Sequence, residues 1–236
     1  MKPAVGMPFF EVGIKNYLYG DDVLKLALTA EAAAERYDLS VMMIVPYAEI
    51  RRVAEHTKRL VVLAPYMDLL APGRGMADVL PEALYAAGAR GVVLNHCEKS
   101  MPMAAVQQAI GRANELGMLS FVCADSIEMG RALAHFHPDI INPEPTELIG
   151  SGKVSDLSFV EASNAAIHAV DPMIMVEQAA GVSTPEQVYE MIMAGAQGVG
   201  VASGICKSKD PCTMLDAMAH SVRMAFDART RNSITE

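Results

Sequence analysis

The sequence predicts an α/β protein folded as a (β/α)8 barrel, and three observations support this class. Short apolar segments alternate with longer amphipathic segments along the 236-residue chain. Eight such pairs can be counted, which is the number that closes a barrel of about this length. The short segments are apolar almost throughout, as expected for parallel strands covered on both faces. Hydrophobic residues make up 52% of the chain, so a large core can form.

The strand segments are bounded by turn residues and are rich in β-branched and other apolar residues. They are predicted at residues 9–14, 39–45, 59–65, 90–95, 119–125, 138–142, 172–178 and 198–203. Apolar residues then recur with a helical period after each strand. The helices are predicted at residues 21–37, 48–58, 76–88, 103–117, 127–136, 154–170, 184–195 and 210–229.

An open, doubly wound parallel sheet is the alternative architecture for this alternation. The glycine-rich G-x-G-x-x-G turn that marks many such sheets is missing after the first strand. No linker and no low-complexity segment interrupts the pattern. We therefore expect residues 1–236 to form a single barrel domain.

Charge and composition exclude several classes of protein. The net charge is −9 and no block of Lys and Arg is present, so neither nucleic acid nor an anionic membrane is an expected partner. No apolar run reaches the roughly 18 residues of a membrane span, and the N-terminus lacks the apolar region of a signal peptide. The four cysteines have neither C-x-x-C nor zinc-finger spacing. We expect a cytoplasmic protein with reduced thiols and no metal.

A barrel places its chemistry at the carboxyl ends of the strands and in the loops that follow them. Lys15 ends the first predicted strand, His96 follows the fourth, and Glu144 follows the sixth. Glu144 stands between two prolines that restrict its backbone, which suits a positioned general base, although a helix cap or a surface acid would look the same. His96 could polarise a carbonyl or be a structural residue. Lys15 could hold an anion or form a surface ion pair.

Small residues are concentrated in the last three loops, at residues 149–152, 179–183 and 201–204. Such residues let backbone N–H groups approach an anion closely, and loops 7 and 8 of these barrels often bind phosphate. Each run alone could be an ordinary turn. Together with the acid, the imidazole and the ammonium group, they favour a phosphorylated carbonyl compound as ligand.

Four motifs, in this order, resemble the triosephosphate isomerase family, and its short archaeal-type branch most. They are VLPEALYAAGARGVVLNHCEK (79–99), EPTELIGSG (144–152), AAGVST (179–184) and GVGVASGICKSKDP (198–211). The resemblance covers nearly the whole chain. It implies a TIM barrel that interconverts glyceraldehyde 3-phosphate and dihydroxyacetone phosphate, in glycolysis and gluconeogenesis, without a cofactor. It also implies a homodimer or homotetramer.

The resemblance also implies a role for each matching residue. Glu144 would be the base, His96 the neutral electrophile, Lys15 the cation that stabilises the enediolate, and Glu98 a supporting acid. Residues that would contact the substrate or its phosphate, or close over it, are Gly13, Ile149, Gly150, Ser151, Gly152, Gly181, Ser183, Ala202, Ser203 and Gly204.

One departure leaves the substrate open. The family has an Asn two residues before the lysine, and here this position is Gly13. The loss of a hydrogen-bonding side chain could slow the triose reaction, or make room for a four- or five-carbon sugar phosphate. A barrel that binds a phosphate ester without catalysis is a third hypothesis, which the joint presence of Lys15, His96 and Glu144 disfavours.

Overall fold

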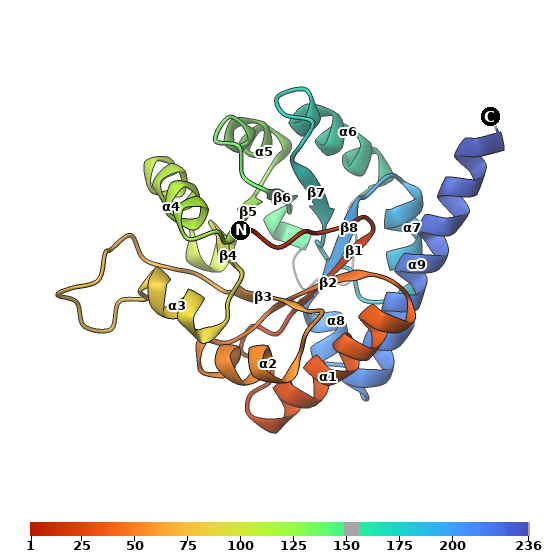
Figure 1. The fold of residues 1–236 in the computed structure, drawn as a ribbon. Helices are drawn as coiled ribbons and strands as arrows, with labels where there is room; N and C mark the ends of the chain where they lie inside the picture. The colour runs from red at the N-terminus through yellow and green to blue at the C-terminus, as the bar shows by residue number, and fades with distance from the viewer. Residues whose placement is uncertain (149–155, 236) are drawn as a thin grey trace.

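The computed structural model describes residues 1–148 and 156–235. Its strands are β1 (Phe9–Gly13), β2 (Ser40–Ile44), β3 (Val61–Ala64), β4 (Gly91–Leu94), β5 (Leu119–Ala124), β6 (Ile140–Pro143), β7 (Met175–Gln178) and β8 (Gly198–Val201). All neighbouring strands pair in parallel, and β1 pairs with both β2 and β8, which closes the barrel (Figure 1). The barrel prediction is therefore confirmed, and the open-sheet alternative is wrong.

Helices surround the barrel on its outside (Figure 1). In the described ranges they are α1 (Asp21–Arg36), α2 (Ile50–His56), α3 (Pro81–Ala87), α4 (Met103–Glu115), α5 (Ile127–Ala134), α6 (Leu157–His168), α7 (Pro185–Met193), α8 (Ser203–Cys206) and α9 (Pro211–Thr235). Short 3-10 turns are η1 (Tyr47–Glu49), η2 (Cys97–Lys99) and η3 (Thr146–Leu148). The turns η2 and η3 lie in the loops after β4 and β6, where His96 and Glu144 are found.

Three helices differ from the sequence prediction: α3 begins later, α8 was missed, and α9 continues to Thr235 instead of ending at residue 229. A helix was expected from residue 76, but α3 begins only at Pro81. Proline lacks an N–H and disfavours a helical conformation in the residue before it, and Leu80 is indeed extended. Residues 65–80 instead form a long loop that stands away from the body of the protein (Figure 1). The short helix α8, which directly follows β8, was missed because four residues are too few to show a period.

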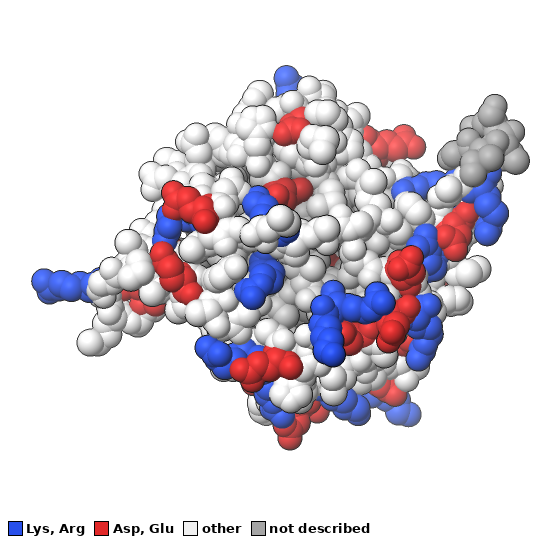
Figure 2. All heavy atoms as spheres, viewed as in Figure 1, with Lys and Arg blue, Asp and Glu red and all other residues white. Residues whose placement is uncertain are grey.

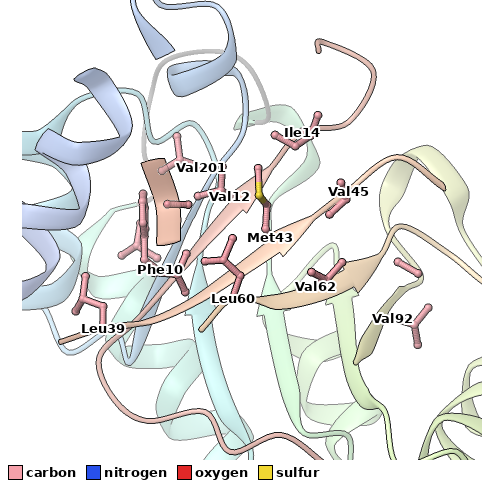
Figure 3. Close-up of a cluster of buried hydrophobic side chains, with 14 of the residues drawn as sticks. Phe10, Val12, Ile14, Leu39, Met43, Val45, Leu60, Val62, Val92 and Val201 are labelled. Carbon is pink, nitrogen blue, oxygen red and sulfur yellow. The ribbon is translucent and has the colours of Figure 1, made fainter. Parts of the chain in front are cut away.

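Side chains alternate along each strand between the inside of the barrel and the surrounding helices. On β1 and the residue after it, Phe10, Val12 and Ile14 belong to the outer core, where they lie with Met43 and Val62 of neighbouring strands (Figure 3). This layer joins the strands to α1, α4, α7 and α9. It holds the barrel rigid, so the strand ends are fixed relative to one another.

The inside of the barrel has a different composition at each end. Towards the start of the strands it is apolar, with Phe9, Met42 and Leu63 in one buried cluster. The ring of Phe9 occupies the space beside Gly198, where a Cβ would lie only 2.1 Å from the ring. The next inward residue of β1 is Glu11, which is buried. The apolar floor therefore gives way to polar groups towards the carboxyl ends of the strands.

The surface shows mixed charge. Lys and Arg side chains are interspersed with Asp and Glu on the face shown in Figure 2. No helix of the described residues is long and apolar enough to cross a membrane. The cysteines Cys97, Cys123, Cys206 and Cys212 are all free in the structure.

Candidate active site

A cavity of about 660 Å³ opens at the carboxyl ends of the strands. Lys15, His96 and Glu144 all line it, although 129 residues of sequence separate the first from the last. They come from the loops after β1, β4 and β6. The closed barrel thus brings together the three side chains that the sequence analysis selected.

Lys15 lies in the turn that leaves β1. Its backbone has a φ of +47°, the left-handed region that residues other than glycine seldom adopt. The strand is held up to this point, because the N–H of Ile14 donates to the carbonyl of Ile44 at 3.1 Å. The ammonium Nζ donates to Glu98 Oε1 at 3.0 Å. Burial alone would lower the pKa of Lys15, but the hydrogen bond and charge of Glu98 outweigh it and raise that pKa, so the lysine is a cation.

His96 is the residue that precedes the η2 turn. Its Nδ1 accepts a hydrogen bond from the backbone N–H of Glu98 at 3.1 Å. Because that nitrogen acts as the acceptor, the proton of the neutral ring is assigned to Nε2. Burial lowers the pKa of His96, the charge of Lys15 lowers it further, and Glu98 opposes both. The ring is therefore neutral at neutral pH and presents an N–H donor to the cavity.

Glu144 follows the last residue of β6, Pro143. Its backbone N–H donates to the carbonyl of Ala124 at 2.7 Å, which extends the pairing with β5 and fixes the residue. Its Oε2 lies 3.9 Å from His96 Nε2, and its side chain is 12% exposed. Burial raises the pKa of Glu144 to about 7, with Lys15 opposing and Glu98 adding to the rise. A carboxylate with this pKa can accept and return a proton near neutral pH.

Of the remaining predicted residues, some line the cavity and others lie beside it. Gly13, Gly181, Ala202 and Ser203 line it with Glu98. Ser183 does not, because its N–H and hydroxyl both bond to Gln187 Oε1 at the start of α7. Gly204 is also outside the lining and lets the β8 loop approach the β7 loop, since a Cβ there would lie 2.7 Å from the Cα of Ser183. The predicted lid, Ile149, Gly150, Ser151 and Gly152, lies outside the described residues.

Sequence reasoning missed a set of polar residues inside the barrel: Glu11, Asn142 and Glu177. All three are buried, with exposed fractions of 5%, 4% and 0%. Glu11 and Asn142 line the cavity from below, whereas Glu177 lies behind them. A charged residue inside an otherwise apolar strand, as in FFEVG, was the available signal. Residues 9, 11 and 13 share the inward face of β1, so the position of Glu11 inside the barrel could have been inferred.

Among the residues that the structure describes, no group of three or more His, Cys, Asp and Glu side chains could hold a metal ion. What the site does have is a cation, a neutral N–H donor and a carboxylate around one cavity. This set can remove a proton from a carbon atom while it stabilises negative charge on a neighbouring oxygen.

Comparison with known proteins agrees with this geometry. A family model described as triosephosphate isomerase matches residues 14–218. The triosephosphate isomerase of Methanobacterium bryantii is 36% identical over 209 residues, which cover 86% of this chain and 92% of that protein. That of Sulfurisphaera tokodaii is 31% identical over 233 residues, which cover 97% of this chain and all of that protein.

The fold agrees with a solved structure as well. The triosephosphate isomerase of Bartonella henselae superposes with a TM-score of 0.76 at 17% identity, covering 92% of this chain and 99% of that one. Both archaeal relatives fit the archaeal-type branch expected from the motifs. The two alternatives, a four- or five-carbon sugar phosphate and a barrel without catalysis, gain no support from these matches.

Proposed function

Because the chain belongs to the triosephosphate isomerase family, we propose that it interconverts glyceraldehyde 3-phosphate and dihydroxyacetone phosphate. The observation that carries this proposal is the meeting of Lys15, His96 and Glu144 around one cavity. The reaction moves one proton between two adjacent carbon atoms and another between the oxygen atoms that they carry, through an enediolate. It needs a base for the carbon, donors for the oxygens and a grip on the phosphate.

Glu144 is the base. Its carboxylate takes the proton from the carbon next to the carbonyl, the electron pair of that C–H bond moves into the new C=C bond, and the π pair of the carbonyl moves onto its oxygen. The same carboxyl group then returns the proton to the neighbouring carbon, so the enzyme ends unchanged. The fixed backbone at the end of β6 suits this task, because proton transfer from carbon requires near-contact geometry. A pKa of about 7 suits transfer in both directions.

His96 and Lys15 stabilise the charge that develops on oxygen. The neutral ring of His96 donates from Nε2 to the carbonyl oxygen. Lys15 supplies the positive charge, and its ion pair with Glu98 keeps the ammonium group at the mouth of the cavity. Hydrogen-bond donors that are already oriented before the reaction stabilise developing charge most strongly in a site that excludes water.

The loops after β7 and β8 hold the phosphate in this proposal. Gly181, Ala202 and Ser203 line the cavity there, and the close packing at Gly204 brings these loops together. Backbone N–H groups of small residues can converge on phosphate oxygens. Ser183 would act from beside the cavity, through the position of its loop.

A coupled assay with glyceraldehyde 3-phosphate tests the function. The wild-type chain should show turnover, with kcat/KM rising as the pH increases through about 7, because Glu144 must be ionised. Glu144→Asp shortens the base by one methylene and should lower kcat by about 10²-fold or more. Glu147→Asp changes an exposed glutamate three residues later and is the matched control. Full activity in Glu144→Asp would exclude this residue as the base.

We also propose that the chain forms a homodimer or homotetramer in the cytoplasm and serves glycolysis and gluconeogenesis. The long 65–80 loop supports an assembly, because it projects from the body (Figure 1). Its residue Met76 is 94% exposed. Light scattering coupled to gel filtration tests this. If the loop lies in an interface, the assembly formed by Met76→Lys should have a lower mass than that of the wild-type chain. A monomeric wild-type chain would refute the proposed assembly.

A further inference from the structure

The polar residues inside the barrel have unused hydrogen-bonding capacity. Within the described part of the chain, Glu11 Oε1, Asn142 Oδ1 and both carboxyl oxygens of Glu177 have no hydrogen-bond partner, although all are buried. An unpaired buried polar group of this kind costs free energy, typically about 1–3 kcal/mol. Groups of this kind are uncommon in folded proteins, so their presence beside the cavity requires an explanation.

Glu11 is aimed at the reacting end of the cavity. A Cβ at Gly13, one inward position further along β1, would lie 3.4 Å from Glu11 Oε1. The carboxyl group thus reaches up to the space that the missing side chain at Gly13 leaves free. Glu11 also lines the same cavity as His96 and Glu144. Its unpaired oxygen therefore lies beside Gly13, in the cavity that Lys15, His96 and Glu144 also line.

Glu177 lies on the other side of the same carboxyl group. A Cβ at Gly200 would lie 2.6 Å from Glu11 Oε2 and 2.8 Å from Glu177 Oε2, so the two carboxyl groups meet over this glycine. Burial raises the pKa of Glu11 to about 8, with Glu144 adding to the rise and Lys15 opposing it. Burial also raises the pKa of Glu177, well above its usual value. At neutral pH the pair keeps its protons.

We propose that Glu11 is a further substrate-contacting residue, whose protonated carboxyl group donates a hydrogen bond to the substrate oxygen beside Gly13. Glu177 is a positioning residue behind it. Glu11 makes and breaks no covalent bond and transfers no proton to the substrate. It supplies a neutral donor to an oxygen that gains negative charge in the enediolate. This inference rests on the proposed function.

Two variants of Glu11 separate a substrate contact from a structural role. Glu11→Gln keeps a neutral donor of the same length, whereas Glu11→Leu removes it. We expect Glu11→Leu to lower kcat by about ten- to a hundredfold, as for the loss of one hydrogen bond to developing charge. Glu11→Gln should restore most of this activity. Glu35→Gln, on the exposed face of α1, is the control for a change of charge alone.

The pH profile provides a readout that a structural role would not alter. Wild-type kcat should fall above about pH 8 as Glu11 ionises and stops donating, and Glu11→Gln should lack this alkaline decrease. Other titratable groups interact electrostatically with the carboxyl group of Glu11, so the pH profile must be compared between wild type and variants. These groups are Glu177 of β7, Glu144 after β6, Lys15 after β1, Cys123 of β5 and Cys206 of α8.

The possible results are distinct. If wild-type chain turns over triose phosphate and folded Glu11→Leu keeps its kcat and pH profile, the inference on Glu11 is wrong and the proposed function stands. If wild-type chain shows no turnover, the proposed function fails and the inference fails with it. Circular dichroism checks that each variant is folded. Loss of activity in both Glu11→Leu and Glu11→Gln, without a change of the alkaline limb, would also overturn the inference.

Discussion

The buried carboxyl group of Glu11 should make the stability of this protein depend on pH in an unusual direction. An acid that is paired with a cation usually has a lowered pKa in the folded chain, so its contribution to stability grows as the pH rises. A raised pKa reverses the sign of this pH dependence. Folding favours the protonated form of Glu11, so its contribution is complete below about pH 4.5 and is lost as the pH rises through about 8. Between about pH 5.5 and pH 8.5 this single group should lower the free energy of unfolding by roughly 3 kcal/mol.

Urea denaturation at a series of pH values measures this effect. Wild-type chain should lose stability towards alkaline pH, and Glu11→Gln should have a flatter profile that crosses above the wild type. Glu35→Gln should follow the wild-type curve, because this residue is exposed on α1. Parallel curves for wild type and Glu11→Gln would refute the reasoning, since they would mean that Glu11 has the same pKa in the folded and unfolded chain.

Three further predictions concern contacts around the barrel. Asp139→Asn weakens the bonds that this carboxylate accepts from β5 at 2.8 Å and from Lys2, and should reduce stability by about 1–3 kcal/mol in thermal unfolding. Gly200→Ala should destabilise by about 1–3 kcal/mol, because its Cβ would lie 2.6 Å from Glu11 Oε2, and Glu11→Ala in the same chain should recover part of this loss. Glu98→Gln removes a charge that raises the pKa of Glu144, so the acidic limb of the kcat/KM profile should move to lower pH.

Much of the fold could be predicted from the sequence, because period and composition are local signals. Each strand segment is apolar and short, and each helix segment carries an apolar stripe, so eight units in order were recognisable. The failures were also local. The helix at α3 starts late because of Pro81, and α8 is too short to show a pattern. Neither error affected the order in which the strands close.

The site was only partly predictable. Lys15, His96 and Glu144 could be selected because they stand at strand ends, where a barrel places its chemistry. The roles of Glu11 and Glu177 depend on which strands face each other across the inside of the barrel. That information lies in the three-dimensional packing over Gly200 and not in any motif. The neutral state of His96 likewise depends on its burial and on the charge of Lys15, and its tautomer depends on the N–H of Glu98; all three are visible only in the folded chain.

Within the described residues, the apolar layer around Phe9 fills the barrel interior towards the start of the strands, and the cavity lies above it at their carboxyl ends. Water, protons and ligand must all reach Glu11 from the same side, past Lys15 and Glu144. A molecule bound at the mouth would then block this route, and proton exchange between the buried carboxyl groups and solvent would slow while it stays bound. The rate at which the buried carboxyl groups exchange protons would therefore depend on the residence time of the ligand, because both use the same opening.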